Sequence, residues 1–168
     1  WRVATDEINY RRFFDVNDLA ALRIERPEVF EATHALVLRL VSDGKLDGLR
    51  IDHPDGLFDP GEYFQRLREG GVPYVVAEKI LAAGEPLVET WPVDGTCGYE
   101  LLNEINGLFV DAAQVEAFTA LHGAFTGEDL SFAQVAYEKK VLILNTSLAS
   151  ELHMPTHELD ELAQRRRA

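Results

Sequence analysis

Apolar residues recur at helical spacing in one early segment of the chain and form two short strand-like runs after it. Between residues 27 and 43 the apolar side chains repeat every three to four positions, behind a proline at 27 and ahead of Gly44. This pattern predicts a helix that Gly44 ends. Residues 46–52 predict a strand, and PYVVAEKIL at 73–81 predicts a second, mostly apolar one, as in a strand buried on both faces.

The segment between these two strands predicts a turn followed by a helix. His53 precedes a proline, which favours extended backbone at His53, and Asp55-Gly56 is a typical turn pair. Asp59-Pro60 then begins a helix that runs to about residue 69 and ends at Gly70-Gly71. The succession of helix, strand, helix and strand predicts two parallel strands joined by a helical crossover.

The rest of the chain predicts helices. Residues 1–18 are polar and aromatic-rich and show no clear period, whereas helical spacing continues over 98–109, 112–125, 130–145 and 147–167. The apolar run VLIL at 141–144 is an alternative strand, although it continues the preceding helical pattern.

Two parallel strands by themselves leave unpaired edges. Parallel strands occur almost only in larger sheets that are covered on both faces. The sequence therefore predicts an α/β fold cut from a larger protein. We expect self-association of the chain through its exposed strand edges.

Composition excludes several classes of partner. The 168 residues carry a net charge of −13, so neither nucleic acid nor an anionic membrane is an expected partner. The one basic run is residues 165–167. There is no apolar run of membrane-spanning length, no signal-peptide pattern at the start, and a single cysteine, Cys97, so a cytoplasmic location is expected.

Each predicted strand ends in a carboxylate. Alternation places Arg50 and Asp52 on one face of the first strand, and Glu78 at the end of the second. Neighbouring strands lie about 4.8 Å apart, and retaining glycoside chemistry uses two carboxyl groups about 5–5.5 Å apart. The pattern would therefore supply one carboxylate as nucleophile and the other as general acid and base.

Less specific roles remain open for the same residues. Asp52 could cap a turn, and Glu78 could form a surface ion pair with Lys79. Metal ligation by Asp52, His53, Asp55 and Asp59 is another alternative, but their spacing matches no calcium loop. Arg50 favours catalysis, because an arginine on the same face would hold Asp52 ionised and oriented.

GLRIDHPDGL at 48–57 and VVAEKIL at 75–81 resemble the strand-four and strand-five motifs of the α-amylase superfamily, in the form found in the maltooligosyl trehalose synthase family. The resemblance extends to INYRRFFDVNDLAALR at 8–23, ETWPVDGTCGYELLN at 89–103 and SLASEL at 147–152, and so covers essentially the whole chain.

The resemblance implies roles for individual residues. Asp52 matches the nucleophile, Glu78 the general acid/base and Arg50 the arginine that orients the nucleophile. His53 is an expected substrate contact, with a hydrogen-bonded structural histidine as the alternative reading of the same residue. The remaining expected substrate-binding residues are Tyr10 and Arg12, in the approach to the active site, and Trp91 and Tyr99, whose rings could bind sugars or could simply pack.

The resemblance also implies a fold: residues 1–110 as the middle of a (β/α)8 barrel, carrying its strands four and five, and residues 111–168 as a helical insertion. The strand-three motif and the third catalytic carboxylate of the superfamily are absent, so the barrel is incomplete in this chain. Cys97 replaces an expected threonine, a change between small residues that we expect to be tolerated.

The implied reaction is an intramolecular transglycosylation. It converts the reducing-end α-1,4 linkage of a maltooligosaccharide, the expected partner, to an α,α-1,1 linkage, and it needs no metal or organic cofactor. The alternatives are a hydrolase of the same superfamily and a non-catalytic fragment or helical module. We expect the isolated 168 residues to be inactive.

Overall fold

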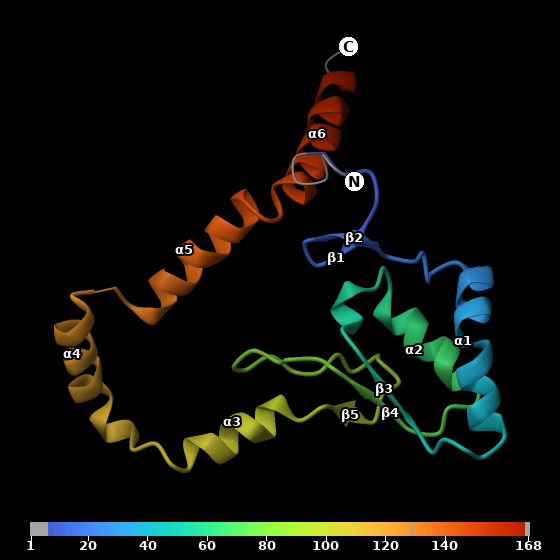
Figure 1. Ribbon diagram of the computed structural model, residues 1–168, viewed down its shortest axis with the longest axis horizontal. Coiled ribbons are helices and arrows are strands. Elements are labelled where there is room, and N and C mark those ends of the chain that lie inside the picture. Colours follow the sequence, from blue (N-terminus) through green and yellow to red (C-terminus); the bar gives the residue numbers. More distant parts are fainter. Residues whose placement is uncertain (1–6, 129, 167–168) are drawn as a thin grey trace. The chain divides into compact units, whose positions relative to one another are not determined.

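The computed structural model describes residues 7–128 and 130–166, and its internal contacts divide the chain into two units (Figure 1). One unit comprises residues 23–112, and the other combines residues 1–22 with 113–168. The second unit joins two segments that lie far apart in the sequence. Residue 167, the last of the predicted final helix and of the basic run, falls outside the described residues.

The unit of residues 23–112 alternates helices and strands. Its elements are α1 (Pro27–Ser42), β3 (Leu49–Ile51), a 3-10 turn (Pro54–Gly56), α2 (Pro60–Glu69), β4 (Val75–Ala77), β5 (Gly95–Thr96) and α3 (Tyr99–Gly107).

Both predicted helices of this unit are confirmed, along with the signals that begin and end them. Pro27 occupies the first turn of α1, and Gly44 follows its end with a positive φ of 66°. At α2 the side chain of Asp59 accepts a hydrogen bond of 2.9 Å from the backbone N–H of Glu62, which satisfies a donor that the first helical turn leaves open.

The predicted parallel pair is confirmed, and a third strand extends it. β3 pairs with β4 in parallel, with Ile51 opposite Ala77, and β4 pairs in parallel with β5, with Ala77 opposite Thr96. The strands are shorter than predicted. The prediction of only two strands was wrong because β5 is two residues long and contains no apolar run.

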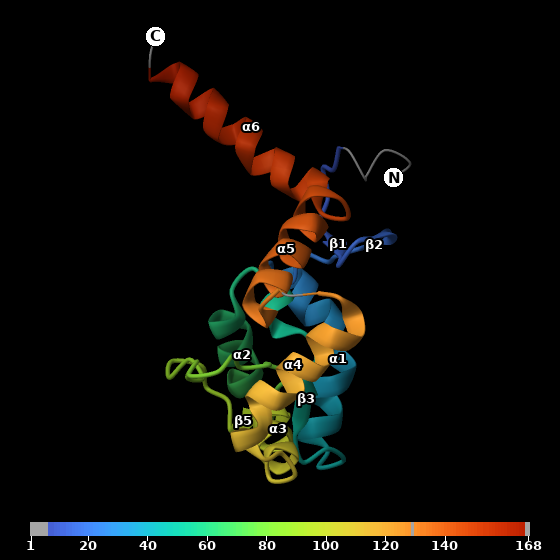
Figure 2. The same cartoon turned by 90° about the vertical axis from the view of Figure 1, so that its left-hand side faces the viewer.

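The core of this unit lies between the two helices and one face of the sheet. Phe30 of α1, Phe64 and Leu67 of α2, and Val75 and Ala77 of β4 form one buried cluster. Figures 1 and 2 show α1 and α2 beside the strands. Since side chains alternate along a strand, the apolar cluster occupies one face and the polar residues of the strand ends occupy the other.

The other unit consists of a short hairpin and helices. Its elements are β1 (Arg12–Phe13) and β2 (Val16–Ala20), which pair antiparallel, followed by α4 (Val115–Thr126), α5 (Phe132–Asn145) and α6 (Ala149–Arg165); a 3-10 turn (Ala112–Gln114) precedes α4. The hairpin was not predicted, because its polar and aromatic residues show no alternation. Residues 141–144 lie in α5, so the alternative strand is wrong.

No helix in the described part of the chain is both long enough and apolar enough to cross a membrane.

Candidate active site

One arginine joins the two carboxylates that the sequence placed at neighbouring strand ends. Arg50 Nη1 lies 2.5 Å from Asp52 Oδ1, and Arg50 Nη2 lies 2.7 Å from Glu78 Oε1. The backbone N–H of Glu78 donates to the carbonyl of Ile51 at 2.8 Å, which continues the parallel pairing past the end of β3. The structure therefore brings Arg50, Asp52 and Glu78 together.

This contact stabilises the ionised form of Asp52. The hydrogen bond from Arg50 comes first among the interactions that hold the pKa of Asp52 below its ordinary value of 3.8, followed by an interaction with Glu78. A guanidinium favours the charged form of a neighbouring carboxyl group. An ionised carboxylate is the form in which Asp52 can act as a nucleophile.

The backbone at His53 contradicts the expected extended geometry. His53 has φ 44° and ψ 52°, a left-handed conformation that is uncommon for a residue other than glycine. Its N–H donates to Glu78 Oε2 at 3.1 Å. This hydrogen bond offsets part of the cost of the strained backbone and fixes one oxygen of Glu78.

The two aromatic residues that the sequence selected lie in different surroundings. The hydroxyl of Tyr99, at the start of α3, donates to Glu78 Oε1 at 3.4 Å. The Trp91 ring lies 5.2 Å from the ring of Phe64 and packs against the core. Tyr99 is thus placed beside the carboxylates, whereas Trp91 makes the packing contacts that the sequence left as its alternative.

The acidic residues of the alternative metal site have other partners. Asp55 accepts a hydrogen bond from Lys79 at 3.2 Å, and Asp59 caps α2. Within the described residues, no three His, Cys, Asp or Glu side chains are placed to hold a metal ion. Lys79 also pairs with Glu85 at 3.1 Å, so the surface pair of Glu78 with Lys79 is not formed here.

Cys97 is the residue at this site whose role the sequence did not reveal. Its backbone N–H donates to the carbonyl of Ala77 at 3.1 Å, and its side chain interacts with the guanidinium of Arg50. That interaction comes first, and the hydrogen bond to Asp52 second, among the causes that raise the pKa of Arg50. A third parallel strand beside VVAEKIL would have placed Cys97 next to Glu78. The two-residue β5 has no apolar run that predicts such a strand.

Replacing Arg50 should move the pH dependence of activity. In Arg50→Gln the pKa of Asp52 returns toward its ordinary value of 3.8, so the acid limb of the profile of kcat/KM in the full-length enzyme should move to higher pH. We expect kcat/KM at neutral pH to fall about 10²–10³-fold. Arg39→Gln, on the exposed surface of α1, is the matched control and should leave both unchanged. An acid limb that stays in place in Arg50→Gln would contradict this account of Asp52.

Tyr10 and Arg12 belong to the other unit. The Tyr10 hydroxyl donates to the carbonyl of Asn17 at 2.8 Å. The side chain of Arg12 is only 2% exposed and meets Glu151 through two hydrogen bonds of 2.6 and 2.8 Å; it also donates to the carbonyl of Ser147 at 2.8 Å. Arg12 therefore ties the β1–β2 hairpin to the start of α6. Figures 1 and 2 show the hairpin beside this end of the helix. Substrate contact by Tyr10 and Arg12 stays a prediction from the resemblance.

The contact between Arg12 and Glu151 should stabilise the fold of the unit that combines residues 1–22 with 113–168. Arg12→Gln should lower the free energy of unfolding by about 2–3 kcal/mol, less than for a fully buried pair because the Glu151 side chain is 36% exposed. Amide hydrogen exchange should accelerate at residues 12–20 and 147–151. Arg12 holds the pKa of Glu151 below its ordinary value of 4.5. The ion pair therefore stabilises the fold fully above pH 4.5, and this stabilisation is lost as the pH falls through the lowered pKa of Glu151.

The neighbouring Arg11, which is exposed, provides the matched control for Arg12. Arg11→Gln should leave exchange at residues 147–151 as in the unmodified protein. Equal exchange in Arg11→Gln and Arg12→Gln would show that the ion pair contributes little.

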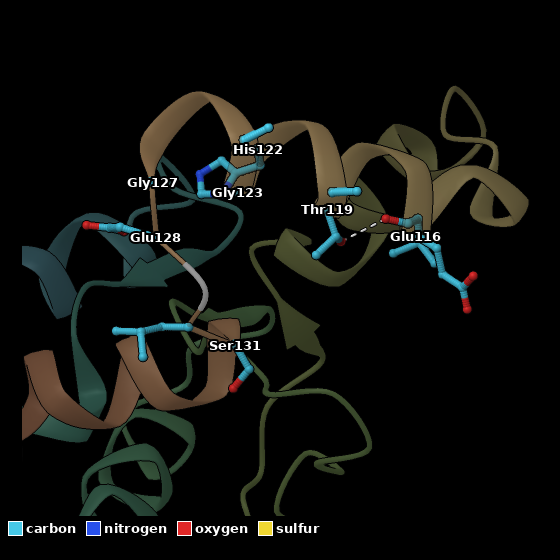
Figure 3. Close-up of a pocket in the computed structure, with 11 residues that line it drawn as sticks. Glu116, Thr119, His122, Gly123, Gly127, Glu128 and Ser131 are labelled. Atoms are coloured by element: carbon cyan, nitrogen blue, oxygen red, sulfur yellow. Dashed lines mark hydrogen bonds between the residues drawn. The ribbon is translucent and has the colours of Figure 1, made fainter.

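A separate hollow lies along α4. This open cavity of about 790 Å³ is lined by residues of α4 and of the segment that leads to α5. In Figure 3 its polar side chains point in different directions, and the one drawn hydrogen bond joins the Thr119 hydroxyl to the carbonyl of Val115 in the same helix, at 2.7 Å. None of the predicted site residues lines it.

Comparison with known proteins finds relatives of one kind over most of this chain. A Mycobacterium tuberculosis protein assigned as a maltooligosyl trehalose synthase is 44% identical over 145 residues, which are 85% of this chain and 19% of that protein. The structure of maltooligosyltrehalose synthase from Arthrobacter ramosus matches with a TM-score of 0.88 and 40% identity, over 95% of this chain and 21% of that one.

A Sulfolobus tokodaii protein assigned to the same enzyme matches with a TM-score of 0.81 and 37% identity, over 93% of this chain and 21% of its own. No family model matches. The resemblance seen in the sequence is confirmed, and the chain spans about a fifth of the length of the relatives that it matches.

Proposed function

Because this chain is homologous to a segment of maltooligosyl trehalose synthases, we propose that it is the part of such an enzyme that carries the nucleophile and the general acid/base. The observation that supports this most directly is the Arg50 guanidinium, which contacts Asp52 and Glu78 at the ends of two adjacent parallel strands. Barrel enzymes carry their chemistry at such strand ends.

The proposed first step is cleavage of the reducing-end linkage. The ionised Asp52 attacks the anomeric carbon and forms a covalent glycosyl-enzyme, while Glu78 gives its proton to the oxygen of the leaving glucose. Arg50 supports this step because its contact with Asp52 orients the carboxylate and stabilises the charged form. The hydrogen bonds from His53 and Tyr99 orient the carboxyl group of Glu78.

The second step returns the glucose to the same site. The freed glucose turns and offers its anomeric hydroxyl, Glu78 removes the proton, and the new α,α-1,1 bond forms as the ester to Asp52 breaks. Two displacements at one carbon give net retention. Water must be kept out during this step, since the same two carboxylates would otherwise hydrolyse the intermediate.

The remainder of the proposed enzyme would complete a (β/α)8 barrel around these strands, with residues 111–168 as part of its helical insertion. Large apolar side chains support the view that further protein covers this chain: Phe125 and Phe132 are 89% and 88% exposed. Burial of such rings against protein is strongly favourable. We therefore propose that the isolated 168 residues are inactive. Association of the chain through its strand edges stays a prediction, and so does its cytoplasmic location.

Incubation of the full-length enzyme with maltopentaose separates the proposed function from its nearest alternative. Transglycosylation should remove reducing ends while little glucose appears. A hydrolase with the same carboxylate pair should instead raise the number of reducing ends with time. Failure of the full-length protein to change the substrate at all would favour the non-catalytic alternative.

A further inference from the structure

Three residues with reactive or polar side chains lie side by side at the ends of the three strands. Ile51, Ala77 and Thr96 share one row of the parallel sheet. The residues that follow them are Asp52, Glu78 and Cys97, and the backbone bonds from Glu78 to Ile51 and from Cys97 to Ala77 extend the register to that next row. Cys97 is therefore the third member of the row that holds the two carboxylates.

The guanidinium of Arg50 is the group that all three neighbours share. It contacts Asp52 through Nη1 and Glu78 through Nη2, and it interacts with the side chain of Cys97. Arginine carries five donors in a planar fork, so partners in different directions fix its orientation as well as its position. Arg50 is half-exposed, and a long side chain with fewer partners would sample other rotamers.

We propose that Cys97 is a positioning residue that holds the Arg50 guanidinium where it meets both carboxylates at once. The inference rests on the proposed function of Asp52 and Glu78. A role in packing explains Cys97 less well, because its side chain is exposed and is absent from the buried core. Removal of the sulfur should therefore change the site and leave the fold intact.

The groups that act on Asp52 determine how this can be measured. Arg50 and His53 come from its own strand end and Glu78 from the end of β4, while Cys97 at the end of β5 interacts with Arg50 and Tyr99 at the start of α3 donates to Glu78. Of these, Arg50 comes first in lowering the pKa of Asp52. A loosened Arg50 should therefore move the acid limb of kcat/KM toward higher pH, in the same direction as Arg50→Gln but by less.

The test compares Cys97→Ala with Cys97→Ser in the full-length enzyme. We expect Cys97→Ala to lower kcat about 3–10-fold with little change in KM, since the proposed role of the sulfur is to act through Arg50 on Asp52, and to move the acid limb upward. Cys97→Ser should restore both toward the unmodified enzyme, because a hydroxyl oxygen also accepts a hydrogen bond from Arg50.

Two outcomes would overturn the role of Cys97. An unchanged kcat and acid limb in Cys97→Ala would show that Arg50 needs no third partner, and loss of folding in that variant would assign Cys97 to packing. This test can be told apart from a failure of the proposed function. If the full-length enzyme hydrolyses maltopentaose, the pH dependence of its hydrolysis rate still shows whether Cys97→Ala moves the acid limb.

Discussion

Replacement of Asp52 by alanine should lower turnover of maltopentaose by the full-length enzyme about 10⁴-fold or more, the scale of loss seen when a covalent nucleophile is removed. The proposed mechanism gives the physical reason: Asp52 is the group that forms the glycosyl ester, whereas Glu78, which contacts Arg50, Tyr99 and the N–H of His53, is assigned the proton transfer. The loss should persist with maltosyl fluoride, whose leaving group needs no proton, because the missing step is the attack itself.

Asp55→Asn is the matched control for Asp52. Asp55 is an exposed acidic residue in the adjacent turn, and its partner is Lys79. We expect turnover in this variant to stay within a few-fold of the unmodified enzyme. Similar losses in Asp52→Ala and Asp55→Asn would show that local charge, and not nucleophilic attack, explains the effect.

Glu78→Gln should lower turnover of maltopentaose about 10²–10⁴-fold, the usual contribution of a general acid/base. The two half-reactions should respond differently. With maltosyl fluoride the first step needs no proton donor, so a rapid initial release of fluoride should survive, while the later transfer, which needs a base, stays slow. A stopped-flow measurement of fluoride release distinguishes the two steps.

Glu85→Gln serves as the control for Glu78, since Glu85 is also an ion-paired carboxylate, bound to Lys79 at 3.1 Å. It should show ordinary rates with both substrates. Loss of the initial fluoride release in Glu78→Gln would contradict a pure acid/base role, because it would place Glu78 in the attack step as well.

Most of the site could be predicted from local patterns. Alternation along two short strands was enough to place Arg50 with Asp52, and a single crossover was enough to place Glu78 next to them, because both follow from the geometry of parallel strands. The spacing of apolar residues and the proline at 27 likewise predicted α1 correctly.

The remaining features depend on contacts that local patterns do not encode. The left-handed backbone of His53 opposes the usual preference before proline and is compensated by a side chain 25 residues away. Cys97 lies beside Arg50 because of β5, which shows no apolar run. Arg12 meets Glu151 across 139 residues, a separation over which sequence spacing carries no information.

The central claim, that Asp52 forms the covalent intermediate, is tested most directly by trapping that intermediate. A maltosyl fluoride with an additional ring fluorine slows breakdown of the glycosyl ester, and tryptic digestion of the full-length enzyme then yields the peptide of residues 51–66, which contains Asp52. The account predicts a sugar adduct on this peptide, which fragmentation in the mass spectrometer assigns to Asp52. An adduct on another residue, or full inactivation with no adduct on this peptide, would contradict it.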